Sequence, residues 1–261
     1  MFKTLSRRSC LSLLLSAPLV AAASGPLRAS DDARRAAVLE RQRRLGARIG
    51  MAAFTAGAEV DADLHLELME EAAAAFEAGL GELDAAEVDA VWSRYAEALA
   101  KIGGPRDLRK STLNALAGLD EELSAALAAL ASEAPRGPAR AVALALRQAG
   151  RAQEMARDAA LIAVGQRRTE AHARLQEARP AFDADLLTLL SGDAEARIPP
   201  PPPAAEAKLL EAQAIWVEFG AIVRDVASAG RTTTFDLEAL AEDRDPLSDA
   251  FAAAASLYEL A

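Results

Sequence analysis

The 261-residue chain contains one cysteine, Cys10, and it lies in an N-terminal segment that we expect to be removed. A mature chain without a thiol can form no disulfide, use no thiolate nucleophile and bind no metal through cysteine. Covalent haem attachment also drops out, because its motif needs two cysteines. We predict no cofactor, with non-covalent haem on His65, His172, Met69 or Met155 as the alternative.

Aromatic residues make up only 4% of the chain, and β-branched residues are sparse. No segment therefore shows the alternating Val, Ile, Thr and aromatic pattern of a strand. Alanine and leucine dominate instead, and both favour helices. The composition predicts an all-α fold.

Recognisable catalytic and metal-binding motifs are also missing. A di-iron site in a helical bundle needs Glu-x-x-His pairs, but the residues three before His65 and His172 are Ala62 and Thr169. We find no nucleophile elbow and no phosphate-cradling loop. We therefore predict that the protein is not an enzyme and has no metal site.

The first 23 residues have the pattern of a signal peptide. Lys3, Arg7 and Arg8 precede an apolar run over 10–20 and three alanines at 21–23. The paired arginines suggest twin-arginine export, with the general secretory route as the alternative. Since the apolar run is about half the roughly 20 residues of a membrane span, we expect no permanent anchor and a periplasmic or secreted location.

Acidic residues outnumber basic ones. Loss of Lys3, Arg7 and Arg8 leaves 26 basic against 39 acidic residues, a net charge of −13. Nucleic acid is a poor partner for such a field, and we exclude it.

Helical spacing predicts four helices before a proline break. The first runs from about 31 to 55, the second starts at Asp61 or Asp63, the third carries Trp92 and ends at Gly103, and the fourth covers about 108–131. Pro135 and Pro138 mark the predicted boundary between domains 31–134 and 139–261.

The second domain repeats the first. Trp92-x-x-Tyr95 recurs as Trp216-x-x-Phe219 at an offset of 124, and 113–117 matches 237–241 at the same offset. Phe76 and Leu80 recur as Phe182 and Leu186 at an offset of 106; prolines 199–203 take up much of the difference. We predict two tandem antiparallel helical bundles of about four helices each.

Residues 40–49, Glu-Arg-Gln-Arg-Arg-Leu-Gly-Ala-Arg-Ile, resemble the A-G-R-Q-R-M-L-S-Q-R-M signature. That signature opens the N-terminal domain of PilJ-type (type IV pili methyl-accepting) chemotaxis transducers. Residues 149–155 look like a worn second copy. The chain departs from the signature at Leu39-Glu40, which replace Ala-Gly, and at Gln153 and Asp158, which replace arginines.

The resemblance implies an extracytoplasmic sensory bundle similar to NarX-type nitrate sensors. Transducers continue into a membrane span and a signalling domain, and we expect neither here, so output would pass through another protein. The expected function is an exported, non-enzymatic sensory or ligand-binding protein for a small anion or a partner protein. The alternative is a periplasmic structural or scaffold protein that uses its helices for assembly only.

Arg43, Gly46 and Gly50 form the candidate binding site. By resemblance, Arg43 falls on the nitrate-contacting arginine of NarX-type sensors. On a helical wheel it lies opposite Val38 and beside small residues that let a second helix approach. Such an arginine could share an anion across the two-fold axis of a homodimer. The alternative is a basic, solvated helix paired with acidic neighbours.

Overall fold

The computed structural model describes residues 31–130 and 138–259. It contains α1 (Asp31–Gly57), α2 (Ala62–Gly79), η2 (Leu80–Glu82), α3 (Ala86–Leu99), η3 (Pro105–Asp107), α4 (Lys110–Ala129), α5 (Pro138–Ala163), α6 (Arg168–Ser191), α7 (Pro203–Ala229) and α8 (Thr234–Glu259). Within these ranges the only β feature is an isolated bridge between Asp193 and Ile198. The prediction of an all-α protein is confirmed. The predicted leader, 1–23, and the predicted break at Pro135 lie outside the described residues.

The proline run separates two helices, as its placement predicts. α6 ends at Ser191 and α7 begins at Pro203, with Pro202 as its extended N-cap residue. Proline suits the first position of a helix, because the amide hydrogen it lacks would have no partner there. Pro180 and Pro246, in contrast, lie inside α6 and α8.

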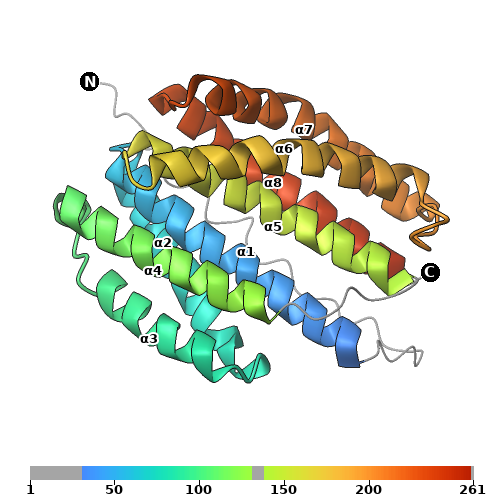
Figure 1. Cartoon of the computed structure of the whole chain (residues 1–261), viewed down its shortest axis with the longest axis horizontal. Helices are drawn as coiled ribbons and strands as arrows, with labels where there is room; N and C mark the ends of the chain where they lie inside the picture. Colours follow the sequence, from blue (N-terminus) through green and yellow to red (C-terminus); the bar gives the residue numbers. More distant parts are fainter. Residues whose placement is uncertain (1–30, 131–137, 260–261) are drawn as a thin grey trace, which may run out of the picture.

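Helices α1 and α5 form the centre of the molecule. They lie side by side, and α3 and α7 lie at opposite outer edges (Figure 1). α1 also packs against α2 and α4, while α5 packs against α6 and α8. Every residue of 49–56 in α1 and of 155–162 in α5 is buried. A helix buried all round must be enclosed by other helices, and these two belong to one continuous apolar core.

The turns after α1 and α5 have the same backbone geometry. Asp61 and Arg167, 106 positions apart, both adopt the left-handed conformation, with φ of 35° and 44°. The amide of Val60 donates to the Thr55 carbonyl at 3.3 Å, and the amide of Gln166 donates to the Leu161 carbonyl at 2.9 Å. The α1–α2 and α5–α6 hairpins therefore match at an offset of 106.

The outer helices match at an offset of 124. Phe76 packs on Trp92 with ring centroids 4.4 Å apart, and Phe182 packs on Trp216 with ring centroids 3.9 Å apart. Both tryptophans are buried. Their side chains therefore serve as core rather than as exposed stacking platforms.

No helix in the described part of the chain is both long and apolar enough to cross a membrane.

Candidate functional site

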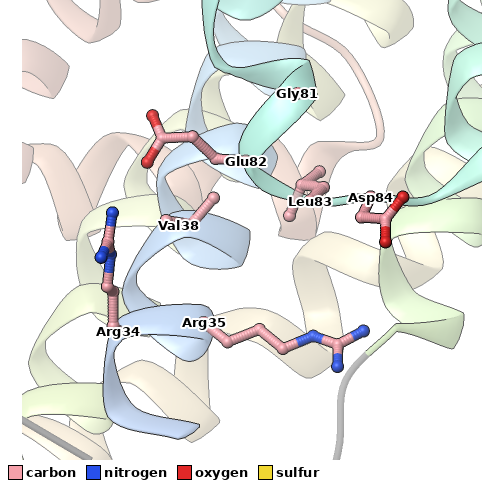
Figure 2. Close-up of a pocket in the computed structure, with 7 residues that line it drawn as sticks. All are labelled: Arg34, Arg35, Val38, Gly81, Glu82, Leu83 and Asp84. Carbon is pink, nitrogen blue, oxygen red and sulfur yellow. The ribbon is translucent and has the colours of Figure 1, made fainter. Parts of the chain in front are cut away.

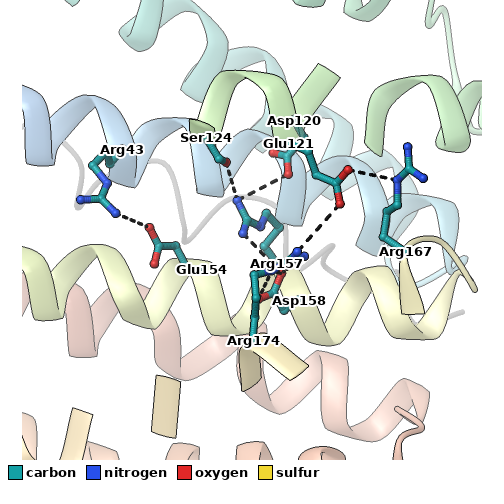
Figure 3. A network of polar contacts seen from close by, with 9 residues as sticks. All are labelled: Arg43, Asp120, Glu121, Ser124, Glu154, Arg157, Asp158, Arg167 and Arg174. Carbon is teal, nitrogen blue, oxygen red and sulfur yellow. Dashed lines mark hydrogen bonds and ion pairs between the residues drawn. The ribbon is translucent and has the colours of Figure 1, made fainter. Parts of the chain in front are cut away.

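Arg43 lies between α1 and α5. Its guanidinium lies 3.3 Å from the carboxylate of Glu40 on its own helix. It lies 3.6 Å from the carboxylate of Glu154 on α5 (Figure 3). The Arg43 side chain is 22% exposed and that of Glu154 is 30% exposed. A second helix does lie beside Arg43, and it comes from the same chain. Both side chains of the pair are therefore partly exposed.

Gly46 and Gly50 lie at close approaches between helices. A Cβ atom on Gly46 would lie 3.7 Å from Leu123 and 3.8 Å from Leu127 and Phe76, which are ordinary contacts. A Cβ atom on Gly50 would lie 2.5 Å from an Asp120 carboxylate oxygen. Gly50 thus provides the space for a buried polar group, whereas Gly46 packs against apolar side chains.

That buried group is an ion network between α4, α5 and α6. The Arg157 guanidinium lies 3.4 Å from Asp120 and 3.3 Å from Asp158, and it donates a hydrogen bond of 2.9 Å to the Ser124 hydroxyl (Figure 3). Arg174 donates to both carboxylate oxygens of Asp158, at 2.8 Å and 3.0 Å. Asp120, Asp158 and Arg157 are all buried, so these charges depend on one another for stabilisation.

Outside this network lies a more exposed layer. The carboxylate of Glu121 forms ion pairs with Arg167 at 3.1 Å and with Arg174 at 3.8 Å (Figure 3). Exposed pairs of this kind contribute little, about 0 to 1 kcal/mol each. Most of the contribution of the cluster to stability therefore comes from the buried residues Asp120, Arg157 and Asp158.

The pKa values of both partners of the buried pair are raised, but for different reasons. Desolvation raises the pKa of Asp120 from 3.8 to about 6, although the Arg157 charge works against the rise. The carboxylates of Asp120 and Asp158 raise the pKa of Arg157, against its own desolvation. Arg157 stays charged because two buried carboxylates stabilise its positive charge. As the pH falls, Asp120 is therefore the member of this pair that takes up a proton.

The equivalent place in the other half has different residues. Offsets of 106 and 124 relate Arg157 to Met51 and Asp120 to Arg244. Arg244 of α8 is 1% exposed and contacts the Met51 sulfur. The carboxylate of Asp245 lies 3.6 Å from the Arg244 Nε, and that Nε has no hydrogen-bond partner among the described residues. A buried guanidinium is thus only partly neutralised there.

His65 of α2 shares this environment. Burial lowers the pKa of His65 from 6.5 to about 4, and the Arg244 charge lowers it further, while Asp61 opposes the shift. No partner for its Nδ1 is found in the described ranges. His65 is therefore a buried imidazole that is neutral at neutral pH.

No family model, curated protein or solved structure matches this chain.

Sequence reasoning missed the buried charges, although a signal for them was present. Asp120 interrupts the apolar stripe between Leu116 and Leu123, and Arg244 interrupts the stripe between Leu240 and Leu247. A charge on the buried face of an amphipathic helix needs a buried partner. Treating Asp120 and Arg244 as core positions would have predicted that each has a buried polar environment.

The register of the two central helices also differs from the one that the signature suggested. Aligning 149–155 with the signature pairs Arg43 with Gln153, at an offset of 110. The hairpin geometry gives an offset of 106, which pairs Arg43 with Ala149 and Gln42 with Gln148. The two registers differ by about one helical turn, so both keep the residues on the same face.

The polar groups gathered here are ionic. In the described residues, no group of three or more His, Cys, Asp or Glu side chains is placed to hold a metal ion. These ionic groups are the partly exposed Arg43–Glu154 pair and, further along α5, the ion network around Arg157.

Proposed function

We propose that this protein is an exported, non-enzymatic binding module of the PilJ-type sensor class. It would be built from two tandem antiparallel units, 31–134 and 139–261, and would pass its signal to a partner protein outside the cytoplasm. The proposal rests on the signature resemblance in α1, on the all-α fold and on the arrangement around Arg43.

The two offsets support the tandem arrangement. Turn geometry, buried stretches and aromatic pairs recur at 106 or 124 positions. Both halves contribute to one core, so the independence of the units needs its own test. We expect fragments 31–134 and 139–261 each to be helical by circular dichroism. Two unfolded fragments would instead mean that α1 and α5 stabilise each other as parts of a single bundle.

The single observation that carries the binding proposal is the partly exposed Arg43–Glu154 pair between the two central helices. An arginine guanidinium binds carboxylates and inorganic oxyanions with the same planar fork of donors. Glu154 therefore acts as an internal competitor for an external anion. Because α5 supplies the second helix, this site would not depend on homodimer formation.

The test is a thermal-shift titration of the mature chain with nitrate, sulfate and acetate at constant ionic strength. A ligand that binds only the folded state raises the melting temperature. We expect a shift in the wild type, a larger shift in Glu154→Gln, which removes the competitor, and no shift in Arg43→Ala. Arg44→Ala is the matched control, because Arg44 lies on the same helix and pairs with Asp249. Equal loss in both arginine variants would indicate a diffuse basic surface and refute the site.

A scaffold function is the second candidate. Its support is that Arg43 already contacts two carboxylates, Glu40 and Glu154, and therefore does not need a ligand for neutralisation. In that case no anion would shift the melting temperature of any variant, and Arg43→Ala would simply destabilise the fold.

A further inference from the structure

Helix α7 carries a second apolar face besides the one that it buries. Its buried face includes Leu209, Trp216 and Phe219. On the opposite side of the helix, apolar residues recur every three or four positions: Ala207, Leu210, Ala214, Val217 and Ala221. We call these five residues the α7 stripe. Their mean spacing of about 3.5 residues is the one at which helices pack lengthwise against each other.

The α7 stripe is exposed in the described part of the chain. The Leu210 side chain is 50% exposed and that of Val217 is 68% exposed, and only Ala221 is partly buried. α7 lies at an outer edge of the molecule, with α6 and α8 packed against its other side (Figure 1). Single exposed apolar residues are ordinary, but an aligned row of them marks a contact surface.

The equivalent helix α3 has no such stripe. At the offset of 124, the positions of Leu210, Val217 and Ala221 are occupied by Ala86, Ser93 and Glu97. All three of these α3 residues are exposed, and the Ser93 hydroxyl donates to a carbonyl of its own helix at 2.9 Å. The fold shared by the two halves therefore does not require large apolar residues on this face.

The α3 side of the molecule presents charges instead. A pocket of about 500 Å³ opens between the start of α1 and the turn before α3. Figure 2 shows that Arg34 and Arg35 point away from each other there, as do the carboxylates of Glu82 and Asp84. The two outer edges of the molecule thus differ in chemistry, and the apolar one belongs to α7.

A second copy of α7 complements the stripe in shape. We consider two α7 helices packed antiparallel about a two-fold axis that passes close to Ala214 and Val217. In this register Leu210 lies opposite the partner subunit's Ala221, and Val217 lies opposite the partner subunit's Ala214. Each large side chain meets an alanine, so the helix axes can approach to about 8 Å.

Charges beside the stripe complement each other in the same register. Glu206 and Arg224 lie on one edge of the stripe, and both are exposed. Among the described residues Glu206 forms no ion pair, and Arg224 pairs only with its chain neighbour Asp225. Antiparallel packing places Glu206 opposite the partner subunit's Arg224, twice per dimer. Parallel packing would instead place like charges opposite each other.

The other edge of the stripe is acidic, with Glu211 and Glu218. Glu211 is already paired with Lys208 of its own helix at 2.6 Å. The lysine therefore reduces the repulsion between Glu211 and the partner subunit's Glu218.

We propose that the α7 stripe is a homodimer contact, in which the α7 helices of two copies of this chain pack antiparallel. Leu210 and Val217 form its apolar centre, and Glu206 and Arg224 form its two ion pairs. This goes beyond the proposed anion site, because the contact uses other residues and leaves the Arg43–Glu154 pair unchanged.

The first test is sedimentation equilibrium of the mature full chain over a range of protein concentrations. We expect a reversible monomer–dimer equilibrium. Val217→Glu buries a carboxylate in the contact and should leave the chain monomeric where the wild type is mostly dimeric. Ser93→Glu is the matched control, because it makes the same change at the equivalent exposed position of α3, and it should dimerise like the wild type. Circular dichroism should show the same helicity in all three proteins.

A charge exchange tests the antiparallel register. Glu206→Arg and Arg224→Glu should each weaken the dimer about tenfold, because each places two pairs of like charges in contact. The double variant Glu206→Arg, Arg224→Glu should restore the wild-type affinity. Within one chain these residues are 18 positions apart on a helix, about 27 Å, so the rescue can arise only between two chains.

Three results would overturn the proposal. They are a monomeric wild type at all concentrations, equal loss of the dimer in Val217→Glu and Ser93→Glu, and no rescue in the charge-exchange variant. A chain that stays monomeric and binds a different protein through α7 belongs to the first of these. The anion site has a separate readout: Arg43→Ala should keep the dimer, and Val217→Glu should keep the response to oxyanions.

Discussion

The two halves of the molecule place different chemistry at equivalent positions. Where α4 meets α5, Asp120 and Arg157 form a buried ion pair within a hydrogen-bonded network. Where α8 meets α1, the matching positions hold Arg244 and Met51. The α1–α2 and α5–α6 turns have the same geometry, but one interface buries compensated charges and the other buries a guanidinium with an apolar partner. The comparison shows that equivalent positions between helices can hold either an ion pair or an arginine beside a methionine.

Among the substitutions considered, replacing Arg157 should cause the largest loss of stability. In Arg157→Met, Asp120 would lose its closest cation while staying buried, and Asp158 would keep only Arg174. Uncompensated buried charge typically costs about 3 to 5 kcal/mol. We expect the free energy of unfolding, measured with urea, to fall by about that amount.

The double variant Arg157→Met, Asp120→Leu converts the α4–α5 interface to an apolar one. We expect it to recover at least half of the lost stability, because apolar replacement of a whole buried pair is often neutral. A loss below about 1 kcal/mol in the single variant would mean that Arg157 contributes little to stability.

The pH dependence of stability should separate the two halves next. The folded pKa of Asp120 is raised to about 6, so the folded state holds its proton more tightly and stability falls as pH rises from about 4 to 6. The folded pKa of His65 is lowered to about 4, so its contribution rises as pH increases from 4 to 6.5. In the wild type these contributions oppose each other.

Single variants should expose each contribution. Relative to the wild type, Asp120→Asn should become more stable as pH rises through this window, and His65→Gln should become less stable. Each difference should be on the order of 2 to 3 kcal/mol between pH 4 and pH 6.5. Urea unfolding at several pH values measures it. Parallel curves for the three proteins would contradict the assignment.

Alanine substitutions at Gly46 and Gly50 of α1 should have smaller effects on stability, and the two should differ. A methyl group on Gly50 would press on Asp120 and on the Arg157 side chain at 3.2 Å, so Gly50→Ala should destabilise by about 1 to 3 kcal/mol. Gly46→Ala makes only ordinary contacts, and it should be neutral or stabilise by up to about 1 kcal/mol through helix propensity. Thermal unfolding of both variants is the measurement. Similar changes in the two would argue against a special role for Gly50.

Much of the fold could be predicted from the sequence because its signals are local. The apolar periodicity and the Gly103-Gly104-Pro105 break set helix existence and approximate bounds, and the recurrence of Trp92 as Trp216 identified the matching outer helices. These features depend on residues close in sequence or on simple repetition.

The arrangement around the candidate site could not be predicted in the same way. That Arg43 meets Glu154 depends on the packing of α1 against α5, and no local pattern specifies that pairing. The worn signature in α5 also suggested a register one turn away from the observed one, since alanine-rich helices match well in several registers. The pocket near Arg34 likewise forms only when the start of α1 reaches the turn at 81–84.

Arg244 gives the smallest expected effect and the sharpest contrast with Arg157. Arg244 has its neighbour Asp245 as its nearest carboxylate, at 3.6 Å from its Nε, and its desolvation and the charge of Arg48 lower its pKa. Because its burial is poorly compensated, Arg244→Met should change the free energy of unfolding by no more than about 1 kcal/mol in either direction. The charge it carries lowers the pKa of His65, so that pKa should rise in the variant. With only two histidines in the chain, an NMR titration of their ring signals would follow the change directly. A loss of stability as large as that of Arg157→Met would show that the Arg244–Met51 contact stabilises the fold as strongly as the ion pair does, and the two interfaces would then be equivalent in energy as well as in position.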